Sequence, residues 1–151
     1  MKVIGFNLTK ILVEKPAELK ANFSVNNHIE FIEIDKEQLD IVKDAEPVKI
    51  KFRYTVSYDS SDAKDKKKET KSDSGNLIFE GIILLALDKE LAKEILKSWK
   101  KKEINSEFKL PLFNLILRKC TPKALDLEDQ LGLPLHVPLP KIGAPSKQDK
   151  A

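Results

Sequence analysis

The sequence predicts an α+β fold, in which a curved four-stranded antiparallel sheet is followed by two helices and an extended C-terminal segment. Three observations predict it. Apolar and polar residues alternate over the first two thirds of the chain, which is the period of a strand with one buried face. After Asp88 the apolar residues recur at helical spacing instead. The strand-like segments all precede the helical ones, so we expect one antiparallel sheet and no βαβ units.

The first two strands are predicted at residues 4–13 and 23–34, and in each the buried face changes side once. In the first strand the alternating apolar residues are Ile4, Phe6 and Leu8, followed on the other parity by Ile11 and Val13. Because a slip of one residue turns every following side chain to the other face, we expect a β-bulge near Lys10. The second strand changes parity at Ile32 and Ile34. Two such slips predict a strongly curved sheet.

The third strand, residues 48–58, has the clearest alternation in the chain. One side of it is apolar and the other polar, with Val48, Ile50, Phe52, Tyr54, Val56 and Tyr58 facing Lys49, Lys51, Arg53, Thr55 and Ser57. Residues 59–74 carry almost no apolar side chain, and we expect a flexible hairpin loop there. The fourth strand, residues 77–87, is apolar on both sides in its second half, which predicts a central strand covered on both faces.

Two helices are predicted after Asp88, a residue that suits the N-cap position. The first has an apolar stripe of Leu91, Ala92, Ile95, Leu96 and Trp99. The second is expected to begin near Pro111, with a stripe of Leu112, Phe113, Leu115, Ile116 and Cys120. Thr121-Pro122 should bend or end this helix, because proline removes a helical hydrogen bond.

The C-terminal part is predicted to be irregular. A short turn at residues 126–131 should be closed by Gly132 and Pro134, and the proline-rich residues 133–140 should run extended. Residues 143–151 are expected to be a disordered tail. No linker composition interrupts the remainder, so we predict a single domain at residues 1–142.

Composition argues against several classes of protein. The net charge is only +3, and the one dense basic run, residues 64–71, is interrupted by Asp65 and Glu69, so we predict no nucleic-acid partner. The single cysteine fits a reducing compartment. No apolar run approaches the roughly 18 residues of a membrane span, and the N-terminal residues turn polar too early for a signal peptide. We therefore expect a cytoplasmic protein without membrane insertion.

The sequence carries no recognisable catalytic, metal or cofactor motif. The candidate metal ligands His28, His136 and Cys120 are far apart and lack any ligand spacing. Cys120 falls on a predicted buried stripe, where a thiol is inert. The five glycines are scattered singly, so there is no phosphate-binding loop. We predict no catalytic residues, no metal and no cofactor, and hence no enzyme.

Three features instead indicate a binding protein, although each also fits a core role. The row Phe52, Tyr54, Val56 and Tyr58 could line a groove for apolar peptide segments. Trp99 ends a lysine-rich helix at the margin of its stripe, which is a good position for a contact with a partner. The strap around Leu135 and Val137 is apolar but cannot form a helix, and it could make one wall of the same groove.

The order of the elements resembles that of the SecB family of export chaperones. Glu80-Gly81-Ile82-Ile83 resembles that family's Gly-Ile-hydrophobic signature in the fourth strand. Residues 133–139, Leu-Pro-Leu-His-Val-Pro-Leu, resemble its C-terminal Leu-Pro-hydrophobic segment. The likeness covers most of residues 3–142 and is architectural more than motif-based.

The resemblance implies a homo-oligomer, in the family a dimer of dimers, that holds unfolded polypeptides without ATP. Two features depart from the family. Family members are typically acidic, and an acidic sheet face docks the translocation motor SecA, whereas this chain carries Lys49, Lys51 and Arg53 on its clearest polar strand face. The aromatic client subsites of the family are only partly represented. Docking of the motor is therefore not implied here.

These observations lead to a first hypothesis and two rivals. The first is an ATP-independent holdase chaperone for unfolded or precursor polypeptides, acting in export, in general holding or beside a toxin–antitoxin pair, and self-associating as a dimer or tetramer. The second is an adaptor or structural subunit whose apolar face is permanently covered by one partner. A small-molecule-binding domain or an enzyme without a recognisable motif comes third.

Overall fold

The computed structural model describes residues 1–16, 23–38, 44–60 and 75–143. Most of the predicted hairpin loop, residues 61–74, and of the predicted tail, residues 144–151, lies outside them. Over the part of the chain that is described, no helix is long and apolar enough to cross a membrane.

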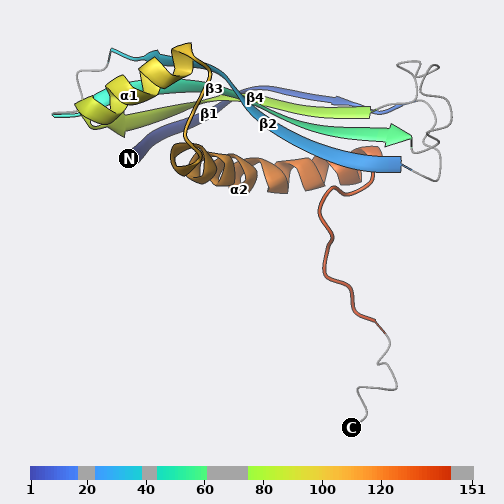
Figure 1. The fold of residues 1–151 in the computed structure, drawn as a ribbon. Helices are drawn as coiled ribbons and strands as arrows, with labels where there is room; N and C mark the ends of the chain where they lie inside the picture. The colour runs from blue at the N-terminus through green and yellow to red at the C-terminus, as the bar shows by residue number, and fades with distance from the viewer. Residues whose placement is uncertain (17–22, 39–43, 61–74, 144–151) are drawn as a thin grey trace, which may run out of the picture.

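The chain forms four strands followed by two helices (Figure 1). Their bounds are β1 Lys2–Glu14, β2 Phe23–Lys36, β3 Glu46–Ser60, β4 Gly75–Leu87, α1 Lys89–Lys100 and α2 Ser106–Leu131. The strands make one antiparallel sheet in the order β1-β4-β3-β2. This is the predicted α+β fold, with β1 and β2 at the two edges.

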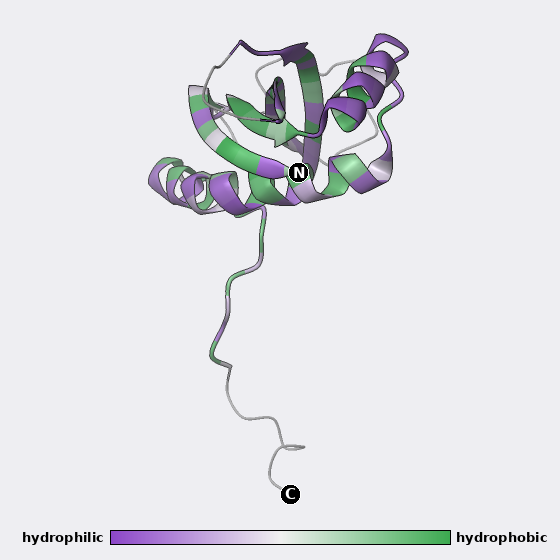
Figure 2. Cartoon of the chain, turned by 90° about the vertical axis from the view of Figure 1, so that its left-hand side faces the viewer, coloured by the Kyte–Doolittle hydropathy of each residue, from purple (hydrophilic) through white to green (hydrophobic). Residues whose placement is uncertain are grey.

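Register shifts occur where the sequence changes parity. One lies between Leu8 and Lys10 in β1, and one lies between Phe31 and Glu33 in β2, which skips Ile32. Both predictions are therefore confirmed. A further shift between residues 3 and 5 of β1 was not predicted. Each bulge increases the local twist, and the end-on view in Figure 2 shows strongly curled strands.

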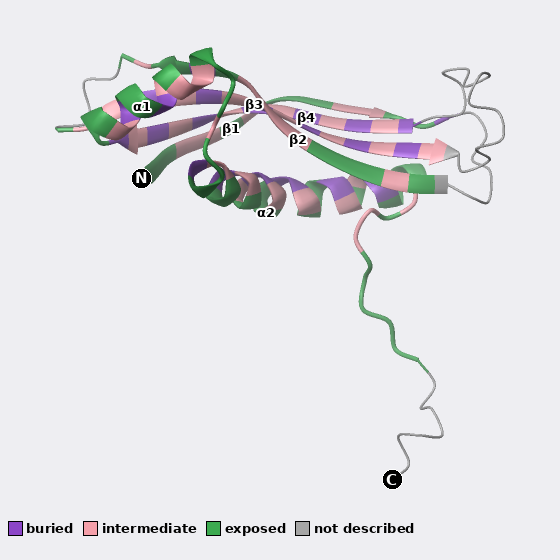
Figure 3. Cartoon of the chain, in the orientation of Figure 1, coloured by how far each residue is buried: buried purple, intermediate pink, exposed green. Residues whose placement is uncertain are grey.

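The core lies on one face of the sheet. The six predicted inward residues of β3 are all fully buried, and β4 adds Leu77, Phe79, Ile83, Leu85 and Leu87. Figure 3 shows the resulting alternation of buried and half-buried residues along both strands. Both helices contribute to the same apolar cluster, with Ala92 and Ile95 from α1 and with Phe108, Leu112, Ile116, Cys120 and Ala124 from α2.

Gly81 allows the β1 backbone and the Phe52 ring of β3 to approach β4 unusually closely. A Cβ atom there would lie 2.6 Å from the backbone oxygen of Asn7 and 2.7 Å from Cζ of Phe52. The Phe52 ring, in turn, stacks on Phe6 with centroids 5.5 Å apart. Only glycine leaves room for this ring directly over β4.

β4 is a central strand, as predicted, but its two faces differ. Its inward row is buried, whereas the apolar residues of its outward row, Ile78, Ile82, Leu84 and Ala86, are only half-buried. The expectation that both faces are covered is therefore not met within the single chain. The β1 strand beside it also exposes apolar side chains, those of Val3, Ile4 and Ile11.

α1 begins after Asp88, as the sequence predicts, although the Asp88 side chain makes no capping hydrogen bond. α2 differs from the prediction, because it starts at Ser106 and continues through Pro111 and Pro122 to Leu131. Its buried residues recur every four positions from Phe108 to Glu128, and both prolines are exposed. Packing of this long row against the sheet outweighs the two lost hydrogen bonds. Four residues turn the helix by slightly more than one revolution, so the row winds around α2 as the twisted sheet requires.

The chain after α2 leaves in the irregular conformation expected. Gly132 caps the helix with a left-handed φ of 68°. Leu133 is buried at 5% exposure, whereas Leu139 and Ile142 are exposed. Only the first part of this segment therefore packs on the domain, and in Figure 1 the rest extends away from it.

Candidate functional site

The outer edge of β2 is the first component of a candidate site. β2 pairs with β3 on one side, and no strand of the described chain pairs with its other side. The backbone N–H and C=O groups along such an edge can pair with another extended chain. Proteins either protect such an edge against unwanted pairing or use it to bind another chain.

A cleft of about 550 Å³ opens beside this edge. It lies between β2, the C-terminal end of α1 and the beginning of α2, and residues from both faces of β2 line it. The lining residues are His28, Ile29, Glu30, Phe31, Ile32, Arg53, Trp99, Lys102, Ile104, Lys109 and Phe113. The cleft therefore combines an unpaired strand edge with a wall that is partly apolar and partly charged.

The aromatic residues of the cleft come from three separate elements. Phe31 of β2 meets Phe113 of α2 edge to face, with ring centroids 5.1 Å apart. Trp99 lies in the last turn of α1, on the same stripe as the buried Ala92 and Ile95, and is itself half-buried. Aromatic side chains that keep an exposed part offer a large contact area at little conformational cost.

The turn between the helices places Ile104 and Lys102 at the cleft. Lys102 has a positive φ of 54°, and its backbone N–H donates to the carbonyl of Trp99 at 2.9 Å. The side chain of Asn105 then accepts a hydrogen bond from the Glu107 N–H at 3.0 Å, which starts α2. This tight connection holds the beginning of α2 beside the end of α1.

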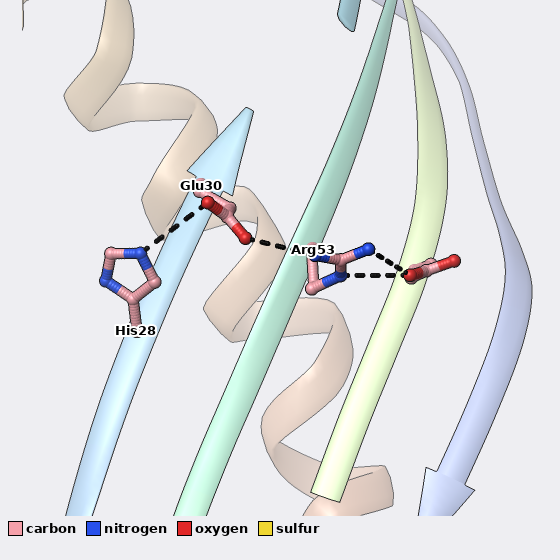
Figure 4. Close-up of polar contacts among 4 residues, drawn as sticks. His28, Glu30 and Arg53 are labelled. Atoms are coloured by element: carbon pink, nitrogen blue, oxygen red, sulfur yellow. Dashed lines mark hydrogen bonds and ion pairs between the residues drawn. The ribbon is translucent and has the colours of Figure 1, made fainter. Parts of the chain in front are cut away.

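The outward face next to the cleft carries a charge network, drawn in Figure 4. Nε and Nη2 of Arg53 each lie 2.9 Å from the carboxylate of Glu80, and Nη1 lies 3.4 Å from that of Glu30. The hydrogen bond to Glu80 is the largest cause of the raised pKa of Arg53. His28 lies 3.9 Å from the other oxygen of Glu30. Glu30 and Arg53 thus form ion pairs with each other or with other residues of the sheet.

Lys102 and Lys109 form the basic rim of the cleft. The ammonium group of Lys109 lies 5.8 Å from the ring centroid of Phe113, close enough for a cation–π contact. Lys102 is exposed and Lys109 half-buried. Among the described residues, neither lysine has a carboxylate within 4.0 Å.

The structure does not bring the seven predicted groove residues together. Four of them, Phe52, Tyr54, Val56 and Tyr58, have no exposed surface and belong to the core beneath α2. This is the core role that their pattern also allowed, and a polypeptide could reach them only if α2 left the sheet. They therefore line no open groove in this structure.

The other three predicted residues lie at opposite ends of α2. Trp99 lines the cleft beside Phe113, whereas Leu135 and Val137 follow the end of the helix near Glu128. Phe113 and Glu128 are fifteen positions apart, which is about 22 Å along a helix. Of the predicted groove, Trp99 alone belongs to the cleft.

Sequence reasoning missed most of the cleft. Phe31 and Phe113 carry the signature of ordinary core positions, and only the place of β2 at the sheet edge exposes part of each. Ile104 did carry a signal, since it is a lone apolar residue in a charged connection between two helices. Together with Trp99 five residues earlier, it indicates an apolar contact at that turn.

A second polar cluster lies at the far end of α2, inside the core. Glu128 is fully buried and accepts hydrogen bonds from the Tyr58 hydroxyl and from the His136 backbone N–H. Nδ1 of His136 completes the cluster. Since every contact joins neighbouring elements of the fold, this cluster fixes the strap to the domain.

Metal and thiol chemistry find no support in the described residues. No group of three or more His, Cys, Asp or Glu side chains in them is placed to hold a metal ion. Burial raises the pKa of Cys120 to about 11, which keeps the thiol protonated at neutral pH. The lining of the cleft contains no serine, threonine or cysteine.

Comparisons with protein-family models, with curated proteins and with solved structures found no match to this chain. The likeness to the SecB family stays a prediction from the order of elements and two short segments. The geometry of the β2 edge and its cleft is therefore the ground on which a function is proposed.

Proposed function

We propose that the protein is an ATP-independent holdase chaperone that binds extended segments of unfolded or precursor polypeptides along the β2 edge. One observation carries the proposal, namely that an unpaired strand edge lies directly beside an aromatic cleft. The cytoplasm is the proposed setting, and protein export is one process that such a holdase would serve.

The two parts of the site supply two kinds of binding energy. The backbone of a client adds a strand to β2 through main-chain hydrogen bonds, which do not depend on the client sequence. Apolar client side chains that point into the cleft are buried against Phe31, Trp99 and Phe113, at roughly 25 cal/mol for each Å² removed from water. Binding of this kind needs no nucleotide.

Self-association is part of the proposal and is supported by the opposite edge of the sheet. β1 is an edge strand of thirteen residues, and Val3, Ile4 and Ile11 on it are 39–48% exposed. The half-buried outward row of β4 lies next to it. A second copy that covers this surface would leave the β2 clefts free, and several clefts would hold one long client by avidity.

The same surface favours the second candidate, an adaptor or structural subunit. If one permanent partner covers β1 and the outward row of β4, the protein serves that partner alone. Export, general holding and adaptor roles then differ in how many unrelated polypeptides the protein binds.

An aggregation assay tests the proposal. Without nucleotide, stoichiometric amounts of the protein should suppress aggregation of several unrelated denatured proteins. Trp99→Ala and Ile104→Ala should each weaken this suppression several-fold, because each removes apolar surface from the cleft. Leu131→Ala, which truncates an exposed side chain at the other end of α2, is the matched control and should act like the wild type.

Two results would count against the proposal. If no client is held while the protein co-purifies with one defined partner, the adaptor role is favoured. If Trp99→Ala and Ile104→Ala hold clients as well as the wild type, the site lies elsewhere.

A further inference from the structure

The charges around the cleft are unevenly distributed. Arg53 and Glu30 line it together, but they are paired with each other, and Arg53 is also paired with Glu80. What remains on the cleft wall is the basic rim of Lys102 and Lys109, without a carboxylate within 4.0 Å in the described part of the chain. A ligand in the cleft therefore meets two lysines that form no ion pair with a described residue.

Further positive charge surrounds this rim. The last turn of α1 and the residue after it carry Lys97, Lys100 and Lys101, all exposed. These three lysines need no ligand to explain them, since cations are favoured at the negative end of the helix dipole. The exposed carboxylates of Glu103 and Glu107, in the same stretch of chain, offset part of this charge, and none of these five residues lines the cleft.

The helix dipole does not explain the position of Lys109. It is the fourth residue of α2, where the helix dipole is positive and a cation is disfavoured. It is also half-buried over the ring of Phe113, at 5.8 Å from the centroid. An acidic group of a ligand at this point would be stabilised by both the ammonium group and the helix N-terminus.

We propose that the cleft selects extended polypeptide segments in which acidic side chains accompany the apolar ones. This inference rests on the proposed function and names the client chemistry of the same site. Apolar client residues occupy the wall formed by Phe31, Trp99 and Phe113, and neighbouring carboxylates pair with Lys102 and Lys109. Segments flanked by basic residues meet like charge there and bind more weakly.

The expected size of the preference follows from the exposure of the two lysines. An ion pair near the surface changes an equilibrium by about threefold, so two pairs give a preference of about tenfold. Salt screens such pairs, and the preference should shrink as the ionic strength rises. The apolar contribution does not shrink, so binding itself should persist in salt.

Fluorescence anisotropy with two labelled peptides tests the inference. Both peptides have the same length and the same alternating apolar core, and one is flanked by glutamates and the other by lysines. We expect the acidic peptide to bind about tenfold more tightly at low salt, with the difference narrowing at high salt. Equal affinities, or tighter binding of the basic peptide, would overturn the inference while leaving the proposed function intact. If neither peptide binds, the proposed function itself fails.

Charge reversal separates the cleft from the net charge of +3. The double variant Lys102→Glu with Lys109→Glu should lose or reverse the preference for the acidic peptide. The control Lys89→Glu with Lys123→Glu reverses the same number of charges at exposed positions that do not line the cleft, and it should keep the preference. If both double variants lose it equally, the overall charge and not the cleft sets the selectivity. The salt titration of the wild type needs no variant and stands if a double variant fails to fold.

Discussion

Nδ1 of His136 lies 2.7 Å from Oε1 of Glu128, and neither side chain has any exposed surface. The other carboxylate oxygen accepts the hydroxyl of Tyr58 and, at 3.2 Å, the backbone N–H of His136. One buried carboxylate thus joins β3, α2 and the C-terminal strap. Buried polar groups that satisfy one another specify a unique arrangement, and the loss of one leaves its partners without a bond.

Replacement of this carboxylate should therefore destabilise the protein. For Glu128→Gln we expect a loss of about 1–3 kcal/mol in the free energy of unfolding, because the amide keeps one oxygen and places an NH2 group where either Tyr58 or His136 had an acceptor. Denaturant unfolding measures it. Asp129→Asn, at the exposed neighbouring position, should change stability by less than about 0.5 kcal/mol. Equal effects of the two variants would contradict the role of the cluster.

Both tyrosines of the chain should resist ionisation while the protein is folded. Burial, and then the nearby Cys120 and Glu128, raise the pKa of Tyr54 to about 12. Burial and the hydrogen bond to Glu128 raise the pKa of Tyr58 above its usual range. Since the chain has only these two tyrosines, the ultraviolet absorbance of tyrosinate reports them alone.

The native protein should show no tyrosinate signal at about pH 10, where the tyrosines of the denatured chain are half ionised. The folded state favours the neutral form, so this contribution to stability is complete below about pH 10 and is lost as the pH rises toward 12. A native titration midpoint near 10 would show that the two rings are open to solvent.

The single thiol reports whether clients reach the inward row of β3. Cys120 is fully buried, and burial raises its pKa to about 11. At pH 8 we expect an aromatic disulfide reagent to react with it slowly in the native protein and rapidly in denaturant. Saturation with a client peptide should leave the slow rate unchanged, because the cleft lies outside the core. A faster reaction with a client bound would mean that α2 opens and that Phe52 and Tyr54 do contact clients.

The glycine in the middle of β4 should not tolerate a side chain. In Gly81→Ala, the new Cβ meets the backbone oxygen of Asn7 at 2.6 Å and the Phe52 ring at 2.7 Å. Overpacking of this kind costs about 1–3 kcal/mol, which thermal or denaturant unfolding measures. Gly5→Ala is the matched control, because its Cβ has its nearest contact at 3.4 Å with the Leu84 side chain. It should cost clearly less, and the opposite order would refute the close approach at Gly81.

The local pattern of apolar and polar residues predicted the structure correctly where a residue's neighbours in sequence decide its environment. The alternation in β3 predicted its buried and polar rows, and the parity changes predicted the bulges near Lys10 and Ile32. The local pattern did not predict the bounds of α2 correctly. Proline at 111 and 122 argues for a boundary in an isolated helix, but the long buried row from Phe108 to Glu128 keeps the helix intact.

The binding surface was the hardest part to predict. The aromatic row on β3 has the composition expected of a groove, and it lies in the core because α2 covers it. Phe31 and Phe113 have the composition expected of a core, and they line the cleft because β2 is an edge strand. The spacing of apolar residues along the chain is the same for a buried row and for the wall of a cleft, so spacing cannot tell them apart.

The sequence by itself determined the α+β class, the four strands and their bulges, and the onset of the first helix, because these depend on periodicity and on residues close together in the chain. Only the tertiary structure decided which strand has a free edge, which apolar residues α2 covers, and that Glu128, Tyr58 and His136 meet. Strand order and helix docking join residues far apart in sequence, and burial follows from that arrangement.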